Sequence, residues 1–436
     1  LVGSEMCIRD RSLAWANDNQ TLFYARQDDA NRGDRILRHR VGTAAENDEL
    51  VYHDPDGRFY VDVSRTRSGE WLVIESSGQI TSEIHVLDAD DPDGPLRVVA
   101  PRQRGIEYQL EHSGDRFYLR TNLEAPNFRI MSVTTDLDEP SGWVEVVPHD
   151  PERYLVGIEA FREHLVLTER RDGYQGLSVI DLDTGSARRL TMSEAVSTTE
   201  SGVNETFDTT LFRCECSSLV TPDTVIEIDL DDGESTTLKT QRVTGYQPER
   251  YVTRRLEAIG HDGVRIPVSL VHRTDVRPDG RNPLYLTGYG SYGSSYDPTF
   301  SSTRLSLLDR GVVVAIAHVR GGGELGRHWY ESGKFLAKQN TFLDFIACAE
   351  MLRDTGWAGP ERIAIEGGSA GGLLIGAVIN MRPDLFAAAI ADVPFVDVVN
   401  TMLDPTIPLT IGEYEEWGDP ADPEYFRAML DYSPYD

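Results

Sequence analysis

The sequence predicts two domains, a β-propeller over residues 13–248 and an α/β domain over residues 249–436. Three observations lead to this fold class. In the first domain, short apolar strands recur with a period near 47 residues. In the second, continuous apolar strands alternate with helical segments. The second domain also carries the segment Gly367-Gly368-Ser369-Ala370-Gly371 where a predicted strand meets a predicted helix.

The repeat of the first domain appears when its predicted strands are aligned. One series of strands recurs at steps of 46 to 49 residues: 21–24, 70–73, 116–119, 164–167 and 210–213. A second series follows it at steps of 46 to 48 residues: 36–40, 84–88, 130–134, 177–181 and 225–229. A regular step of this length is typical of propeller blades and does not suit an irregular all-β sandwich. We count five blades, and therefore expect a partial propeller.

The second domain shows the pattern of a mostly parallel sheet. Its predicted strands are unbroken apolar runs at 266–271, 284–286, 312–317 and 363–365. Between them lie helical segments such as 341–353, whose apolar residues fall on one face. A helix over 372–381 should end before Pro383. Strands that are apolar throughout are buried on both faces, so we expect helices on both sides of the sheet.

Ser369 is the candidate nucleophile. It follows the apolar strand and precedes the apolar helix, with glycines on both sides that permit a sharp turn. Such a turn lifts the serine Oγ above the sheet and points the next backbone N–H, that of Ala370, toward the reacting oxygen. The pattern predicts an α/β-hydrolase that uses an acyl-enzyme, rather than a glycine-rich loop without chemistry.

The histidines complicate this prediction. A serine nucleophile needs a histidine base, which α/β-hydrolases supply after the serine in the chain. All ten histidines precede Ser369. Either the base comes from upstream or the chain stops before its triad is complete. We favour truncation, because the chain starts at Leu1 rather than methionine and stops abruptly at Asp436.

The N-terminal segment and the cysteines bear on location. Residues 1–12 lack the apolar stretch of a signal peptide, and we expect them to be a non-native leader. Four cysteines in 436 residues do not form a disulfide framework, and Cys214 and Cys216 suit buried thiols better than a metal site. We expect a cytoplasmic protein, although a missing true N-terminus leaves a periplasmic location open.

Composition excludes several partners. The formal net charge is −30, from 72 acidic and 42 basic residues. Nucleic acid is therefore not an expected partner, since binding it requires a clustered basic face. No apolar run approaches the length of a membrane span, so no membrane partner is expected either. The acidity itself indicates a solvated acidic surface or an attraction for cationic substrates.

One glycine-rich segment imitates a nucleotide-binding motif. Residues 321–326 satisfy G-x-G-x-x-G after a predicted strand. A dinucleotide site also requires an amphipathic helix directly afterwards and an acidic residue at the end of the next strand, and neither follows here. We therefore expect no nucleotide, no other cofactor and no metal.

Four segments in order resemble the prolyl oligopeptidase family of serine peptidases, and most closely its oligopeptidase B group: 288–293 (GYGSYG), 318–326 (HVRGGGELG), 367–372 (GGSAGG) and 411–418 (IGEYEEWG). The resemblance extends from about residue 13 to residue 436. It implies a seven-bladed propeller that caps an α/β-hydrolase domain, so that N-terminal blades would be missing here.

The resemblance also implies roles for individual residues. Ser369 would be the nucleophile, and the Tyr289 hydroxyl would donate to the oxyanion beside the Ala370 N–H. Tyr292, in the same matched segment, would contact substrate. The family usually has a tyrosine where this chain has Thr287, which leaves Tyr289 intact.

Two acidic residues are expected to set specificity. In oligopeptidase B the pair matching Glu413 and Glu415 lines the pocket for the residue before the cut and receives its cationic group, as two carboxylates suit a guanidinium. The alternative is that the acidic run of Glu413, Glu415 and Glu416 is a solvated surface turn. Asp297 matches an acid used toward the preceding substrate residue, but Thr299 replaces its partner, so a second basic preference is not expected to be strong.

Together these observations predict a serine endopeptidase that cuts short basic peptides after Arg or Lys, with this chain an inactive fragment of it. A propeller over the cleft would exclude folded proteins. Two alternatives remain: a proline-specific or acylaminoacyl peptidase of the same family, and a non-catalytic propeller-containing binding protein.

Overall fold

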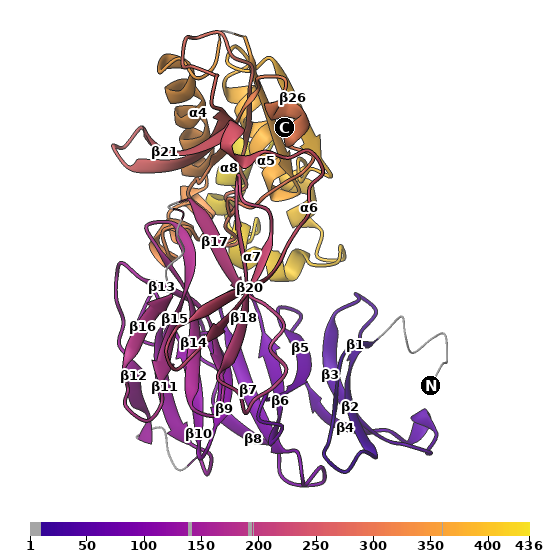
Figure 1. Cartoon of the computed structure of the whole chain (residues 1–436). Coiled ribbons are helices and arrows are strands. Elements are labelled where there is room, and N and C mark those ends of the chain that lie inside the picture. The colour runs from indigo at the N-terminus through magenta and orange to yellow at the C-terminus, as the bar shows by residue number, and fades with distance from the viewer. Residues whose placement is uncertain (1–9, 138–141, 191–193, 195, 360) are drawn as a thin grey trace.

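A computed structural model of the chain describes residues 10–137, 142–190, 194, 196–359 and 361–436. They form a propeller-like set of sheets with an α/β domain stacked on it (Figure 1), which is the predicted fold class. Of the predicted leader, residues 1–9 lie outside the described residues. Residues 10–12 belong to the first strand, where the Ser12 hydroxyl accepts a hydrogen bond from the Val63 N–H at 2.9 Å.

The first domain contains five four-stranded antiparallel sheets within the described ranges. The first consists of β1 (Asp10–Trp15), β2 (Thr21–Gln27), β3 (Gly33–Arg40) and β4 (Glu49–His53). The second consists of β5 (Tyr60–Arg65), β6 (Trp71–Ser77), β7 (Ser82–Asp88) and β8 (Arg97–Ala100). The third consists of β9 (Tyr108–Ser113), β10 (Arg116–Thr121), β11 (Arg129–Thr134) and β12 (Val144–Val147). The fourth consists of β13 (Tyr154–Ala160), β14 (His164–Arg171), β15 (Tyr174–Asp181) and β16 (Ala187–Leu190). The fifth consists of β17 (Ser197–Ser201), β18 (Leu211–Ser218), β19 (Thr224–Asp229) and β20 (Ser235–Thr240).

The two predicted strand series are the second and third strands of each sheet, β2, β6, β10, β14 and β18 followed by β3, β7, β11, β15 and β19. Successive sheets bury their apolar faces against one another, so that each of four separate cores joins one sheet to the next. Cys214 and Cys216 lie in the last of these cores with their Sγ atoms 3.9 Å apart, as buried free thiols. A sheet that can bury an apolar face only against its neighbours requires a stacked array.

The second domain is built on a six-stranded sheet with the order β21-β22-β24-β23-β25-β26. Its strands are β21 (Tyr251–Ile259), β22 (Arg265–Arg273), β23 (Leu284–Thr287), β24 (Val313–Ala317), β25 (Ile363–Gly368) and β26 (Ala388–Asp392). The pairs from β24 to β26 are parallel, as predicted, whereas β21 and β22 are antiparallel additions at one edge. The predicted domain boundary at residue 248 lies between β20 and β21.

The described helices connect and cover this sheet. They are α2 (Leu305–Leu308), α3 (Arg327–Glu331), α4 (Gln339–Asp354), α5 (Ala370–Met381), α6 (Val398–Leu403), α7 (Thr410–Trp417) and α8 (Pro423–Tyr432), with short 3-10 turns at Ala45–Asn47, Pro248–Arg250 and Phe335–Ala337. The predicted helix before Pro383 is α5. One core joins α4 and α5 to the sheet strands. Among the described residues, no helix has the length and apolar character to cross a bilayer.

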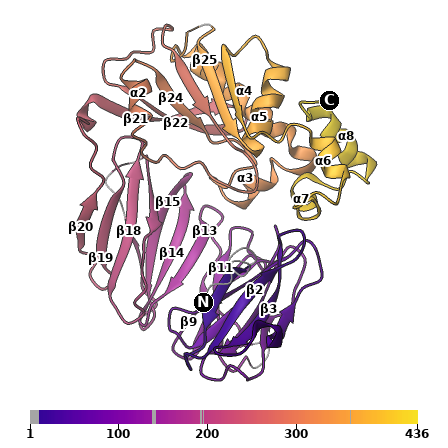
Figure 2. The same ribbon diagram turned by 90° about the vertical axis from the view of Figure 1, so that its right-hand side faces the viewer.

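The helices after β26 lie beside the sheet, and α7 is on the side that faces the propeller (Figure 2). Ion pairs between α7 and the propeller agree with this placement. The fold therefore brings the carboxyl end of β25, the loop after β23 and helix α7 toward the junction of the two domains.

Candidate active site

Ser369 occupies a strained turn between β25 and α5. Its backbone has φ 54° and ψ −119°, outside the regions that serine normally adopts, and its side chain is exposed. The surrounding glycines leave no room for a side chain. A Cβ on Gly367 would lie 2.3 Å from the Gly371 carbonyl oxygen, and a Cβ on Gly372 would lie 2.6 Å from Pro394. The predicted elbow is thus present, with Ser369 at its tip.

Two donors point toward this serine. The Tyr289 ring lies against the elbow, 3.3 Å from where a Cβ on Gly371 would lie, and its hydroxyl interacts with Ser369. Burial raises the pKa of this half-buried tyrosine, so the hydroxyl keeps its proton at neutral pH. The Ala370 N–H makes no hydrogen bond to any described residue. A neutral hydroxyl and a free backbone N–H beside a serine are the donors that an oxyanion requires.

Within the described part of the chain, no histidine is hydrogen-bonded to Ser369. A different serine, Ser269, lies 2.7 Å from His318 Nε2, and Glu324 lies 3.5 Å from His318 Nδ1. This arrangement resembles a triad, but all three side chains are buried in the domain interior. A substrate cannot reach it, so it does not replace the missing base of Ser369.

Glu413 and Tyr292 lie together beside this site. The Glu413 carboxylate accepts hydrogen bonds from the Tyr292 hydroxyl and from Trp417 Nε1, both at 2.8 Å. Burial raises the pKa of Glu413. The Tyr292 ring lies 6.3 Å from the Tyr289 ring, and Glu413 lines a cavity of about 210 Å³ between the domains together with Arg58 and Tyr60 of the propeller. The structure therefore brings Tyr289, Tyr292 and Glu413 to one place.

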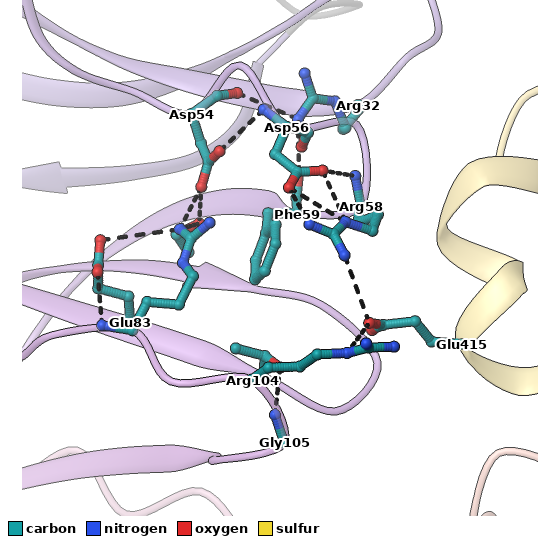
Figure 3. Close-up of polar contacts among 12 residues, drawn as sticks. Arg32, Asp54, Asp56, Arg58, Phe59, Glu83, Arg104, Gly105 and Glu415 are labelled. Carbon is teal, nitrogen blue, oxygen red and sulfur yellow. Dashed lines mark hydrogen bonds and ion pairs between the residues drawn. The ribbon is translucent and has the colours of Figure 1, made fainter.

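Glu415 points elsewhere. It lies two residues further along α7, and its 7 % exposed side chain faces the propeller, with Arg58 and Arg104 each 3.9 Å away (Figure 3). Arg58 is held by a two-point pairing with Asp56. Residues two apart on a helix point to nearly opposite sides. The carboxylates of Glu413 and Glu415, which the sequence predicts to line one pocket, therefore face different sides of α7.

Asp297 is also engaged by the propeller. Both of its oxygens accept hydrogen bonds from Arg170 of β14, at 2.8 and 2.5 Å. A bidentate pair of this kind is directional and strong. The candidate carboxylate for a second substrate residue is therefore paired within the protein in this structure.

The sequence analysis missed two buried charges near Tyr289. The sequence offers a solvated turn for Glu416, yet this residue is fully buried and accepts hydrogen bonds from the Tyr292 N–H at 2.9 Å and the Tyr330 hydroxyl at 2.5 Å. Lys338, buried at the start of α4, bonds to the loop that carries Tyr289. A lysine that precedes an apolar helix resembles any surface lysine, so no sequence pattern distinguishes Lys338.

A strained strand–turn–helix elbow with a serine at its tip and two candidate oxyanion donors, on a mostly parallel sheet joined to stacked four-stranded blades, has the architecture of a propeller-bearing serine hydrolase. Sequence comparison gives the family. Residues 8–241 match the N-terminal beta-propeller domain of prolyl oligopeptidase, and residues 298–436 match the prolyl oligopeptidase family. The chain belongs to the prolyl oligopeptidase family.

Individual relatives agree with this assignment. The chain is 44 % identical over 428 residues to dipeptidyl aminopeptidase BI of Pseudoxanthomonas mexicana, covering 98 % of this chain and 59 % of the relative. It is 40 % identical over 426 residues to protease 2 of Moraxella lacunata, and the match covers 98 % of this chain and 61 % of the relative. The solved structure of oligopeptidase B from Trypanosoma brucei, in a closed form with covalently bound antipain, superimposes on this chain with a TM-score of 0.93 at 40 % identity. The superposition covers 97 % of this chain and 61 % of that chain. The chain thus spans about three fifths of the length of these relatives.

Proposed function

We propose that the protein containing this chain is a serine endopeptidase that cuts short peptides after Arg or Lys through an acyl-enzyme on Ser369. The observation that carries the proposal is the strained elbow at Ser369, with the Tyr289 side chain and the free Ala370 N–H beside it. Tyr289 and the Ala370 N–H would bind the negative oxygen of the tetrahedral intermediate, which is where such donors lower the barrier. The covalent antipain complex of the Trypanosoma relative supports a nucleophile in this architecture.

Specificity for basic residues rests on the carboxylates of α7. Glu413 is bonded to Tyr292 and also lines the cavity between the domains, so an arginine side chain held in that cavity would reach its carboxylate. Glu415 lies next to Arg58 and Arg104 and would assist only if it turned from these guanidinium groups. The second candidate function is that of a proline-specific peptidase. Such an enzyme would not need an ionised Glu413, so removing this charge distinguishes the two functions.

The experiment compares single and double variants in a longer chain that shows turnover. Changing both Glu413 and Glu415 to Gln keeps their size while removing their charge, and a desolvated charge pair is commonly worth about 2 to 5 kcal/mol. We expect kcat/KM for peptides with Arg or Lys before the cut to fall by about 30-fold or more, with most of the loss in Glu413→Gln alone. Peptides with an uncharged residue there should change little.

The same variants carry a pH signature. Because burial raises the pKa of Glu413, the ionised form that binds a cation is lost on acidification at a higher pH than for an exposed glutamate. The fall of kcat/KM for arginine peptides should therefore begin above the usual glutamate range and should disappear in Glu413→Gln. An unchanged preference for arginine in the double variant, or a parent enzyme that prefers proline, would rule out this specificity.

We further propose that the 436 residues by themselves turn over slowly or not at all. All ten histidines precede Ser369, and none of them is bonded to it in the described residues. Loss of one triad member leaves only the contribution of the oxyanion donors and of binding. The alternative of a non-catalytic binding protein also predicts an inactive chain, so activity must be tested in a longer protein.

A further inference from the structure

The loop that carries Tyr289 is not in a relaxed conformation. It follows β23 and includes Gly290 with φ 74° and Tyr292 with φ 60°. The left-handed region is unfavourable for a tyrosine. A Cβ at Gly290 would lie 2.4 Å from the Thr341 side chain, so the loop also packs closely on the start of α4. Such a loop keeps its shape only if specific contacts hold it.

Two buried side chains of opposite charge make these contacts. Lys338, 2 % exposed, donates from Nζ to the Gly290 carbonyl oxygen at 2.6 Å and to Ser291 Oγ at 2.7 Å. Its ammonium also lies 5.0 Å from the centre of the Trp417 ring. Glu416, fully buried, accepts from the Tyr292 N–H at 2.9 Å. Three consecutive loop residues are thus each bonded to a buried charge.

Burying the Lys338 ammonium and the Glu416 carboxylate carries a desolvation cost in free energy. Burial lowers the pKa of Lys338 to about 8, and the described charged group that offsets this effect is Glu416 of α7. Ionised groups bond to backbone and hydroxyl partners more strongly than neutral ones, which offsets part of the desolvation cost. Lys334, one turn earlier, bonds to the Tyr330 hydroxyl at 2.9 Å instead and has no hydrogen bond to the loop among the described residues.

We propose that Lys338 and Glu416 are positioning residues that hold the loop of residues 290–292 and thereby keep the Tyr289 hydroxyl beside Ser369. The proposal rests on the proposed role of Tyr289 as an oxyanion donor. Neither charge touches Ser369, so both act through the loop. Two consequences follow: the effect of Lys338 passes through Tyr289, and it depends on the ammonium charge.

The first experiment measures hydrogen–deuterium exchange of residues 288–295 in the 436-residue chain and needs no catalytic activity. Lys338→Met should speed exchange of the Tyr292 and Gly293 amides about tenfold or more, because the loop opens locally. The matched control is Arg353→Met at the other end of α4, which also removes a cation but one that pairs with Asp354, and it should leave these amides within about twofold of the parent. Equal exchange of the two variants would overturn the proposal.

The parent chain should show the charge dependence directly. Above about pH 8 the ammonium of Lys338 loses its proton, so protection of the same two amides should fall beyond the intrinsic rise of exchange with pH. Lys338→Met should show no such step. A parent protein whose protection follows intrinsic exchange alone across this range contradicts the proposal.

The second experiment tests the route through Tyr289 in a longer chain with turnover. Lys338→Met should lower kcat with little change in KM, but should have no further effect when combined with Tyr289→Phe. The same loss of kcat in both backgrounds would mean a general structural role and would overturn the proposal. A separate measurement tests the proposed function: a fluorophosphonate should label Ser369 in the longer chain. Absence of this label would contradict the proposed function, whatever the result for Lys338.

Discussion

Ser369 is held in a backbone conformation that costs on the order of 1 to 3 kcal/mol, and the neighbouring fold maintains it. The Ser369 N–H donates to the Asp392 carbonyl oxygen at 2.9 Å, and its own carbonyl oxygen accepts from the N–H groups of Gly372 and Phe395. These bonds connect the turn to β26 and to the segment after it. The elbow is therefore fixed by its surroundings before any substrate arrives.

Tyr289→Phe tests the oxyanion role of the hydroxyl. In a longer chain with turnover, this variant should lower kcat by about 100-fold, since one oxyanion donor is worth roughly 3 kcal/mol. KM should change much less, because the negative oxygen exists only in the transition state. Steady-state kinetics with an arginine peptide provides the measurement.

Tyr296→Phe is the matched control for this prediction. The Tyr296 ring stacks on the Tyr289 ring, with 6.0 Å between ring centres. The Tyr296→Phe variant therefore removes a neighbouring hydroxyl and keeps the aromatic packing. Its kcat should stay near that of the parent. If Tyr289→Phe also left kcat unchanged, Tyr289 would be a packing residue.

The residues of α7 show what the sequence could and could not predict at this scale. The motif predicts that Glu413 lines the pocket for the residue before the cut, and the structure places it beside Tyr292. It did not separate Glu413 from Glu415, because the opposite directions of the two side chains follow from the helix that contains them. Glu416 was misjudged because its partners, at residues 292 and 330, are distant in sequence.

At the scale of elements, the sequence predicted the middle strands of every blade and missed the outer strands. The second and third strands are mostly buried and carry a clear apolar pattern, as in β6 and β7. By contrast β20 is exposed along its whole length, and β16 has no buried residue. Strands such as β16 and β20 have no buried face and no apolar alternation, so periodicity cannot reveal them. First strands such as β5 and β9 do bury alternate residues, so their pattern was available in the sequence.

One blade carries a partly buried carboxyl that should affect stability. Glu111 of β9 accepts a hydrogen bond from the Ala160 N–H at 3.3 Å, and burial raises its pKa to about 7. Between about pH 4.5 and pH 7 the folded state therefore binds more protons at this site than the unfolded state. The contribution of Glu111 to the free energy of unfolding should fall as pH rises through this range, by up to about 3 kcal/mol.

Glu111→Gln should remove this pH dependence, since the amide resembles the protonated acid and does not ionise. We expect a higher Tm than the parent at pH 8 and a similar Tm at pH 5, measured by thermal unfolding. Glu70→Gln, at an exposed position between β5 and β6, should match the parent at both values. A Tm difference that is the same at pH 5 and pH 8 would show that Glu111 is ionised in the folded protein throughout.

At the scale of the whole molecule, the two domains meet through charged side chains. Arg170 bonds to Asp297, and Arg327 bonds to Glu107 at 2.6 Å. Arg58 and Arg104 flank Glu415 (Figure 3). These pairs join residues more than a hundred positions apart, so the sequence could not predict them, although it predicted both domains that they connect.

The pairs also place the candidate substrate carboxylates at the domain junction. Of the three acidic residues named from the motif, Asp297 and Glu415 face propeller arginines, and Glu413 faces Tyr292 and Trp417. A cationic substrate side chain would meet Glu413 without first displacing an arginine. This arrangement is the physical basis for ranking Glu413 above Glu415 in specificity.

The central claim is that Ser369 is the nucleophile of a peptidase. The most direct measurement treats a longer chain, one that contains these 436 residues and supplies a histidine after Ser369, with a phosphonate that carries an arginine-like group. Peptide mass spectrometry then identifies the modified residue. We predict a single adduct on Ser369 that forms more slowly in Glu413→Gln, and no adduct or peptide hydrolysis in Ser369→Ala. Hydrolysis that survives in Ser369→Ala, or an adduct on another serine, would contradict the account.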